Sequence, residues 1–280
     1  MSQVRVALIG CGGMGKSLIN QLKTLDTATL VAGVDPFEAA REAFTKDYEV
    51  PSYATLQEVL DAQNPDAVVV AVPNDQHAPM TIAAAEAGRH VFCEKPMSLT
   101  LADCQAMIDA CNKAKVKLQI GQVLRYIADF DKTLRMIKDG DLGEPRHGII
   151  CRYSAPKENW NHTWRDDPTK VGHYLFEVAV HELDFARCVF GKPVAVTAWS
   201  TPMTGEQALW NSVTTAVVEF ENGGVCTFIE GMLNVIGRSE VEISGTGGAV
   251  RFHWGKDFIY RSANGRENFD KTGAEIAEGV

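Results

Sequence analysis

One segment in the second half of the chain carries an acid and a histidine at a spacing that suits proton transfer. In the stretch from Gly172 to Asp184, Glu177 and His181 are four residues apart. In a helix this spacing places their side chains one turn apart on one face, and Asp184 follows on that side. Histidine exchanges protons near neutral pH, so His181 could remove or return a hydroxyl proton while Glu177 orients it or holds the substrate. The alternative is a helix whose polar face happens to carry these groups, and the helix by itself favours that alternative.

A glycine-rich turn near the N-terminus has the spacing of a phosphate-binding loop. Residues 4–9 are an apolar, β-branched run typical of a buried strand, and apolar residues at helical spacing follow from Lys16. The G-x-G-x-x-G motif between them contains Gly10, Gly12, Gly13, Met14 and Gly15. Gly10 would permit the tight turn, Gly12 would let backbone N–H groups reach a pyrophosphate, and Gly15 would let the helix pack against the strand. Since a helix N-terminus favours anions, the motif predicts a dinucleotide site.

Asp35 is a second indication of a dinucleotide. It ends an apolar strand over residues 29–34 and follows Gly15 by twenty positions. An acid at that distance hydrogen-bonds the adenosine ribose of NAD and repels the additional phosphate of NADP. NAD is therefore the predicted cofactor, with NADP possible because Arg41 could approach. Alternatively, Asp35 is a turn or N-cap residue before Pro36.

Lys95 lies at the end of another predicted strand, residues 89–93, between Glu94 and Pro96. In open α/β sheets, ligands bind beyond the carboxyl ends of the strands. Pro96 disfavours the helical region for Lys95, so the chain is extended or turning there. A lysine at this position could hydrogen-bond a substrate oxygen and stabilise the oxyanion that develops during hydride transfer. The alternative is a solvated surface lysine.

The elements that must position these residues form two predicted domains. Strands and helices alternate over residues 4–120, which predicts an α/β Rossmann domain over residues 1–121. From His147 onward strands dominate, and one helix is predicted over about residues 173–190. The predicted strands lie at about residues 147–154, 193–200, 213–221, 224–232, 239–245 and 248–253. Residues 122–280 are therefore predicted to be an α+β domain with a mostly antiparallel open sheet. A polar and aromatic loop at residues 155–171 is long enough to suggest function or mobility.

Composition restricts the partners and the compartment. The net charge of -9 over 280 residues argues against nucleic acid or an anionic membrane as a partner. No apolar run approaches the roughly 18 residues of a membrane span, and the first strand begins by Val4, which leaves no room for a signal peptide. The 7 cysteines are scattered without a C-x-x-C motif, so we expect reduced thiols and a cytoplasmic location. Neither cysteines nor histidines cluster at ligand spacing, and no metal is expected.

Taken together, the motifs resemble those of the Gfo/Idh/MocA family of NAD(P)-dependent oxidoreductases. The resemblance covers nearly the whole chain. It rests on the glycine turn, on Val72-Pro73-Asn74 with His77, on Glu94-Lys95-Pro96, and on residues 177–184. It implies a dehydrogenase or reductase acting on a hydroxyl or keto carbon of a sugar, inositol or related polyol.

The resemblance also implies roles for individual residues. Lys95 and His181 would be catalytic, and Glu177 would match an acidic position that is often aspartate in the family, which leaves its catalytic or structural role open. Pro73, Asn74, His77 and Glu94 would contact the cofactor together with Lys95 and the glycine turn. The substrate would be bound by Lys95, Arg165, Glu177 and His181, and Arg165 has an equally plausible structural role.

Two alternatives and two further expectations follow from the same resemblance. The chain could be a trans-dihydrodiol or imine-type reductase, or a non-catalytic NAD(P)-binding sensor or scaffold of the same fold. Family analogy predicts a homodimer or homotetramer. The chain also ends before the helix and strand with which family members usually continue, so the second domain is expected to be short of that segment.

Overall fold

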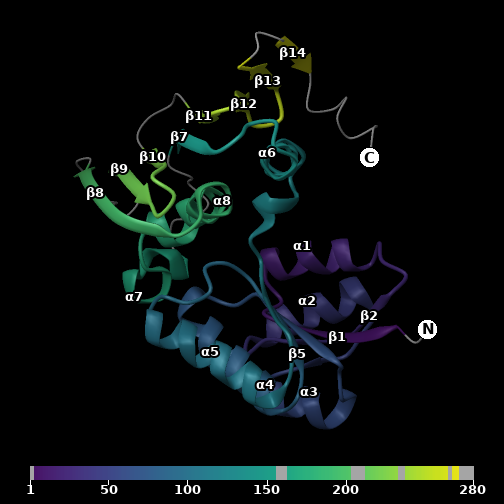
Figure 1. The fold of residues 1–280 in the computed structure, drawn as a ribbon. Coiled ribbons are helices and arrows are strands. Elements are labelled where there is room, and N and C mark those ends of the chain that lie inside the picture. The colour runs from purple at the N-terminus through teal and green to yellow at the C-terminus, as the bar shows by residue number, and fades with distance from the viewer. Residues whose placement is uncertain (1–2, 156–162, 203–211, 233–236, 264–266, 271–280) are drawn as a thin grey trace. The chain divides into compact units, whose positions relative to one another are not determined.

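The structure is a computed structural model that describes residues 3–155, 163–202, 212–232, 237–263 and 267–270. The chain forms two units (Figure 1). The first contains Met1–Gly121 together with Thr163–Gly172, and the second contains Gln122–His162 and His173–Val280. The sequence analysis places one boundary after residue 121 and assigns residues 163–172 to the second domain, whereas in the structure these residues belong to the first unit.

The first unit is built on a parallel six-stranded sheet. From edge to edge its strands are β3 (Ser52–Tyr53), β2 (Ala28–Val34), β1 (Val4–Ile9), β4 (Ala67–Val70), β5 (His90–Cys93) and β6 (Leu118–Ile120). Every neighbouring pair is parallel. This order confirms the predicted Rossmann fold, and it reverses at β1 and β4, the place where open α/β sheets bind ligands.

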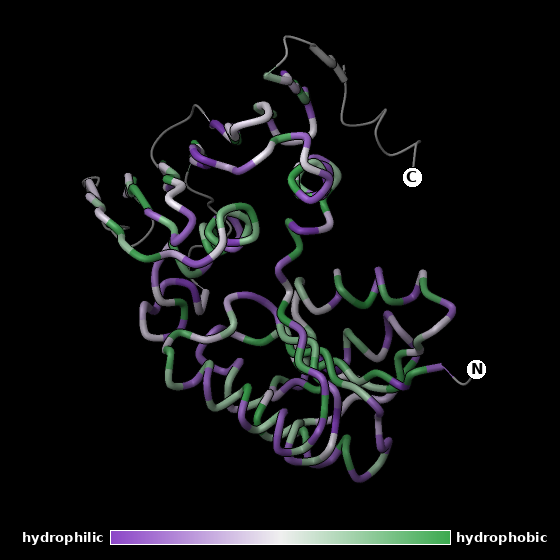
Figure 2. Tube along the Cα trace, in the orientation of Figure 1, coloured by the Kyte–Doolittle hydropathy of each residue, from purple (hydrophilic) through white to green (hydrophobic). Residues whose placement is uncertain are grey.

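Helices cover both faces of this sheet. They are α1 (Gly13–Leu22), α2 (Glu38–Tyr48), α3 (Leu56–Gln63), α4 (His77–Glu86) and α5 (Leu101–Ala114). Because side chains alternate along a strand, Leu8 of β1 packs with Ile19 of α1 and Phe44 of α2. Its neighbour Ile9 belongs to the cluster on the other face, which includes residues of α3, α4 and α5. Figure 2 shows the resulting concentration of hydrophobic residues in the strands of this sheet.

The segment 163–172 packs on this unit through a buried amide. It consists of the short helices η4 (Trp164–Asp166) and α7 (Pro168–Val171). Asn74, at the start of the 3-10 turn η1 (Asn74–Gln76), is buried and donates from Nδ2 to the backbone oxygen of Val171 at 3.0 Å. A residue from the end of β4 is thereby joined to a segment 97 residues away. Of the predicted loop at 155–171, residues 156–162 lie outside the described residues.

The second unit contains an eight-stranded mixed sheet. From edge to edge its strands are β14 (Glu267–Asp270), β13 (Asp257–Ser262), β12 (Gly248–His253), β11 (Arg238–Gly245), β7 (Pro145–Ser154), β10 (Val225–Met232), β9 (Ser212–Phe220) and β8 (Pro193–Pro202). Only β7 and β10 are parallel among these described pairs. The predicted α+β domain with a mostly antiparallel sheet is confirmed, while β13 and β14 were not expected.

Two helices supply the core of this unit. In α6 (Ala128–Asp139), Phe130 makes edge-to-face contacts with Phe185 of α8 (Val180–Phe190) and with Phe252 of β12, at ring-centroid distances of 4.8 and 5.0 Å. Before α8 lies a π-helical turn, η5 (Leu175–Ala179), where the sequence predicts a continuous helix. Such π turns frequently occur at functional sites. No helix in the described ranges is long and apolar enough to cross a membrane.

Candidate active site

The glycine turn has the geometry that a bound pyrophosphate requires. Gly10 has φ +98°, and a Cβ there would lie 2.4 Å from the backbone oxygen of Ala71. A Cβ on Gly15 would lie 2.1 Å from the backbone oxygen of Gly10, so only glycine lets α1 approach β1 this closely. By contrast, a Cβ on Gly12 or Gly13 would meet nothing within 4 Å. Gly10 and Gly15 therefore shape the turn, whereas Gly12 and Gly13 face open space.

The N-terminus of α1 is available for an anion. Gly12 is its N-cap and provides no side-chain hydrogen bond, and no acidic side chain lies in the first turn. Gly12, Gly13 and Met14 are exposed. Backbone N–H groups at a helix start that lack a capping side chain attract phosphate oxygens. These residues therefore fit a dinucleotide pyrophosphate.

Asp35 braces the glycine turn. Its carboxylate accepts hydrogen bonds from the backbone N–H of Cys11 at 3.0 Å and of Phe37 at 2.9 Å. Arg41 donates from Nη1 to the backbone oxygens of Asp35 and Pro36. Asp35 thus holds the turn that precedes α1, and Arg41 is engaged by the same loop. Burial, followed by the charge of Asp35, raises the pKa of Cys11 to about 12, so this thiol stays protonated.

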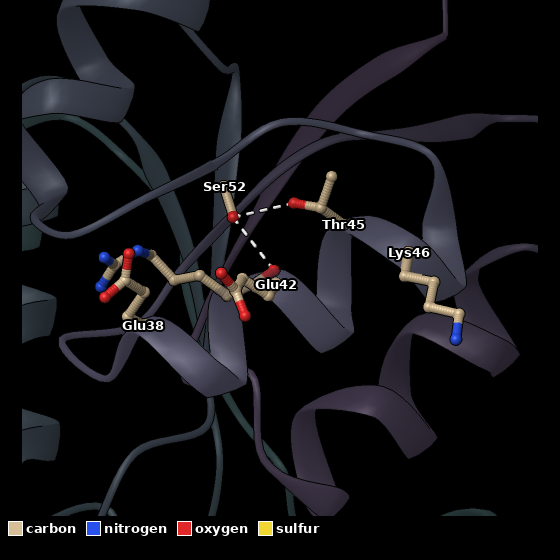
Figure 3. A pocket seen from close by; sticks show the side chains of 6 residues that line it. Glu38, Glu42, Thr45, Lys46 and Ser52 are labelled. Atoms are coloured by element: carbon tan, nitrogen blue, oxygen red, sulfur yellow. Dashed lines mark hydrogen bonds between the residues drawn. The ribbon is translucent and has the colours of Figure 1, made fainter.

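A shallow pocket of about 430 Å³ opens along α2 (Figure 3). It is lined by Glu38, Arg41, Glu42, Thr45, Lys46 and Ser52. Ser52 closes one wall by hydrogen bonds with the Thr45 hydroxyl and the Arg41 backbone oxygen. Arg41 is the residue expected to allow NADP, and the other five were not predicted as catalytic, cofactor or substrate residues. The pocket therefore borders the loop of Asp35, to whose backbone oxygen Arg41 donates a hydrogen bond.

Lys95 follows β5 in a turn that its neighbour stabilises. Its backbone N–H donates to Oε2 of Glu94 at 3.0 Å. Glu94 is buried, and its carboxyl group packs against Gly121, where a Cβ would lie 3.2 Å away. Lys95 itself is half-buried. The Glu94 carboxylate therefore holds the backbone of the residue predicted to be catalytic.

His77 connects the loops after β4 and β5. It is 1% exposed, with Nδ1 2.7 Å from the backbone oxygen of Pro96 and Nε2 3.0 Å from that of Val72. The side chains of Asn74 and His77 both form hydrogen bonds with backbone oxygens of the protein. Pro73 is the N-cap of η1 and is half-buried. These positions align the loop before α4 with the Lys95 turn. Cofactor contact by Pro73, Asn74 and His77 stays a prediction.

Arg165 lies in the segment that returns to the first unit. Its guanidinium carbon is 4.3 Å from the centroid of the Trp164 ring, and both residues are half-buried in η4. Stacking of this kind holds a guanidinium in place without using up its hydrogen-bond donors. Both predicted roles of Arg165, structural and substrate-binding, remain compatible with this position.

The acid–base candidates of the second unit flank the change from π to α geometry. Glu177 is buried in η5, and His181 is half-buried in the first turn of α8. Asp184 makes a bidentate ion pair with Arg125 of η2 (Val123–Tyr126), with distances of 2.7 and 2.6 Å. Asp184 is therefore a structural residue that holds α8. The sequence reasoning did not identify Arg125, because the two partners are 59 residues apart.

The predicted residues are thus divided between the units. The glycine turn, Asp35, Asn74, His77, Glu94, Lys95 and Arg165 belong to the first, and Glu177 and His181 belong to the second. Within the ranges that the structure describes, no group of three or more His, Cys, Asp or Glu side chains could hold a metal ion. The seven cysteines are free.

Comparison with known proteins agrees with this arrangement. Residues 4–122 match the family described as "Oxidoreductase family, NAD-binding Rossmann fold", and residues 130–251 match the "GFO/IDH/MocA C-terminal domain". The chain is 33% identical over 246 residues to the myo-inositol 2-dehydrogenase of Thermotoga maritima, covering 86% of this chain and 70% of that protein. The chain belongs to the GFO/IDH/MocA family. It is an NAD(P)-dependent oxidoreductase with an NAD-binding Rossmann unit, and the predicted family resemblance is confirmed.

Solved structures share both units of this family member. The aldose-aldose oxidoreductase of Caulobacter crescentus, crystallised with glycerol, superimposes with a TM-score of 0.86 at 25% identity, covering 99% of this chain and 88% of that one. The WlbA dehydrogenase of Bordetella pertussis, solved with NADH and UDP-GlcNAcA, gives a TM-score of 0.86 at 23% identity, covering 99% and 83%. The second likeness shows the fold alone.

Proposed function

We propose that this oxidoreductase transfers hydride between a nicotinamide cofactor and a hydroxyl or keto carbon of a polyol, sugar or keto-sugar. The relatives named above support this substrate class, since one is named for myo-inositol and one for aldoses. The observation that carries the proposal is the position of Lys95, at the carboxyl end of β5 in the sheet whose glycine turn fits a pyrophosphate. When bound, the nicotinamide supplies the hydride acceptor or donor.

Lys95 is proposed to stabilise charge on the reacting oxygen. During oxidation the substrate C–O bond gains carbonyl character as hydride leaves the carbon and the proton leaves the oxygen. An ammonium group that donates to this oxygen stabilises its developing negative charge. The Glu94 carboxylate, by holding the backbone N–H of Lys95, fixes the residue before the substrate arrives.

His181 is proposed to accept the hydroxyl proton, and Glu177 to orient His181 or the substrate. In reduction the same imidazolium returns the proton to the carbonyl oxygen, so atoms and charge balance in both directions. The burial of Glu177 within the π turn suits a positioning role better than a solvated one. Arg165 is proposed as an additional substrate contact.

NAD is the proposed preferred cofactor because Asp35 places a carboxylate at the end of β2. Arg41 donates to backbone oxygens within the same loop, which favours a role in shaping the loop. Dissociation constants for NADH and NADPH, measured by fluorescence, test this preference. Equal or tighter binding of NADPH would contradict it.

The catalytic roles are tested by separate Lys95→Ala and His181→Ala substitutions. A screen of myo-inositol, aldoses and keto-sugars with both cofactors, followed by the absorbance of reduced nicotinamide, first provides an assay. Each variant is expected to lose more than about tenfold in kcat, ~1.4 kcal/mol of barrier, while NADH binding to His181→Ala stays unchanged. Lys113→Ala and His147→Ala, at exposed positions, serve as matched controls. A loss below tenfold would remove the catalytic role from the residue concerned.

The alternative functions predict different results. A non-catalytic sensor would bind NADH but show no turnover with any substrate in the screen. A dihydrodiol or imine-type reductase would turn over dihydrodiols or imines and none of the polyols and sugars in the screen. The comparisons do not favour either alternative, since relatives of this chain are named dehydrogenases acting on inositol and D-apiose.

A homodimer or homotetramer is proposed for the assembly. The edge strand β8 exposes Val194, Val196 and Trp199, apolar side chains that association would cover. Sedimentation analysis of the full chain tests this, and a monomer at all concentrations would contradict it. The cytoplasmic location and the lack of a nucleic-acid partner stay predictions from composition.

A further inference from the structure

A charged cluster is buried between α8 and the sheet of the second unit. Arg152 of β7 and Glu230 of β10 are paired neighbours on adjacent strands. Arg152 donates from Nη1 to Oε1 of Glu182, in the first turn of α8, at 2.8 Å. Glu182 is 0% exposed and Glu230 is 1% exposed. The Arg152 guanidinium also stacks on Trp254, 4.6 Å from the ring centroid. The ion pair therefore joins α8 to the central strands.

The charges of this cluster do not balance if both carboxyl groups are ionised. The guanidinium of Arg152 supplies one positive charge. Neither carboxyl oxygen of Glu230 has a hydrogen-bond partner within the described ranges. An ionised carboxylate buried in this way is costly, whereas a protonated one is tolerated. Burial, followed by the charge of Glu182, raises the pKa of Glu230 well above its ordinary value, although Arg152 opposes the shift.

The other titratable groups that face Glu230 add no positive charge. They are the Tyr174 phenol and the thiols of Cys226 and Cys151. Burial is the main cause that raises the pKa of each, so all three stay neutral. Arg152 is thus the cation that both carboxyl groups share.

The cluster holds the turn that carries His181. Glu182 follows His181 directly, and two residues later Asp184 is held by the bidentate ion pair with Arg125. The first turn of α8 is therefore attached on one side to β7 and on the other to η2. These two ion pairs, together with the core contact between Phe130 and Phe185, hold α8, which begins directly after a π turn.

We propose that Arg152, Glu182 and a protonated Glu230 form a positioning cluster for His181, and that loss of the Glu230 proton releases it. A second negative charge on Glu230 would compete with Glu182 for the Arg152 guanidinium. The attachment of α8 to β7 would weaken, and His181 would lose its fixed position. This inference rests on the proposed catalytic role of His181. Glu230 and Glu182 are positioning residues because they act through that histidine.

The test is the substitution Glu230→Gln, which keeps the shape of the protonated carboxyl group and cannot ionise. The kcat of the wild-type protein with NAD and the best substrate of the screen is divided by that of Glu230→Gln at the same pH, so that the pH dependence of proton transfer itself cancels. This ratio should fall as pH rises, and so should the hydrogen-exchange protection of residues 180–184 in the wild-type protein after correction for intrinsic rates. In Glu230→Gln the exchange protection should persist to higher pH. Glu182→Gln should lower kcat by more than about tenfold across the pH range while NADH affinity is unchanged. Glu219→Gln, at an exposed position of β9, is the matched control and should behave as the wild type.

The inference would be overturned if Glu230→Gln and the wild-type protein showed the same pH dependence of both kcat and hydrogen exchange. If His181→Ala abolishes turnover and Glu230→Gln changes nothing, only the positioning cluster fails. If His181→Ala retains turnover, the proposed function of His181 fails. Should Glu230→Gln not fold, infrared spectra of wild-type protein with isotope-labelled glutamate provide the second measurement. A protonated glutamate band at neutral pH supports the inference, and its absence overturns it.

Discussion

The carboxylate of Asp35 accepts a hydrogen bond from the backbone N–H of Cys11 at 3.0 Å, which joins the end of β2 to the glycine turn after β1. The same carboxylate also accepts from the N–H of Phe37. Asp35 therefore shapes the loop in addition to its predicted contact with ribose. Loop geometry and the proposed preference for NAD therefore depend on one side chain.

Replacement of Asp35 should accordingly weaken NADH binding without creating NADPH binding. A hydrogen bond to a charged acceptor contributes about 1.5–3 kcal/mol, and Asp35→Ala removes two of them from the loop. The substitution should therefore raise the Kd for NADH by at least about tenfold. Asp35→Asn, which keeps one acceptor oxygen, should lie between this variant and the wild type. Fluorescence titration with both cofactors measures these constants. A switch to tight NADPH binding in Asp35→Ala would show that the loop does not need this carboxylate.

Alanine at Gly12 and at Gly15 should have opposite effects. At Gly15 the new Cβ would lie 2.1 Å from a backbone oxygen, so the helix must shift, and we expect a loss of about 1–3 kcal/mol in the free energy of unfolding. At Gly12, where φ is -74° and nothing lies within 4 Å, stability should stay near that of the wild type. The methyl group would instead occupy the space of the pyrophosphate and raise the Kd for NADH about tenfold or more. Thermal melts and NADH titrations on both variants separate the two effects, and equal stability of the pair would contradict this account of Gly15.

The ion pair between Arg125 and Asp184 should contribute more to stability than a surface pair of the same chemistry. Asp184 is largely buried and bound by two donors, so Asp184→Ala should lower the free energy of unfolding by about 1.5–3 kcal/mol. The matched control is Asp131→Ala, which removes the more exposed ion pair with Arg135, four residues along α6. That change should cost only about 0.3–0.5 kcal/mol. Urea unfolding of the two variants measures both values, and similar losses would show that burial does not strengthen the Arg125 pair.

Stability should depend on pH through Glu230. Its pKa is raised in the folded state above the ordinary value of 4.5, so the folded protein holds this proton more tightly than the unfolded chain. The corresponding stability is fully present below about pH 4.5 and is lost as pH rises through the folded pKa. The Tm of Glu230→Gln should therefore rise relative to that of the wild type as pH increases above about 4.5 and through the raised folded pKa of Glu230. A difference in Tm that is constant over this range would show that Glu230 has the same pKa in both states.

Local patterns in the sequence were sufficient for most strands and helices. The β-branched runs over residues 4–9 and 66–72 predict β1 and β4 because burial on both faces requires continuous apolar residues. Strand β13 was not expected, since the apolar part of Asp257–Ser262 is short and its pairing with β12 follows from tertiary structure. The π turn at Leu175–Ala179 has the same apolar spacing as an ordinary helix, so periodicity does not distinguish them.

The candidate site was predictable where its determinants are close in sequence. The glycine turn and the Glu94-Lys95-Pro96 turn are local, and the structure shows how each is held. The partners of Asp184 and Glu182 come from η2 and β7, which approach α8 only in the folded unit. Pairs of this kind leave no periodic signal in a single sequence, which is why Arg125, Arg152 and Glu230 were not identified as part of the site.

The return of residues 163–172 to the first unit has a consequence for protein engineering. The chain passes between the units three times, after residues 121, 162 and 172. A chimaera spliced only at residue 121, to borrow the cofactor preference of a relative, would pair the Asn74 amide with a segment that evolved beside another partner. The exchangeable module therefore consists of two pieces, residues 1–121 and residues 163–172, which should be transplanted together.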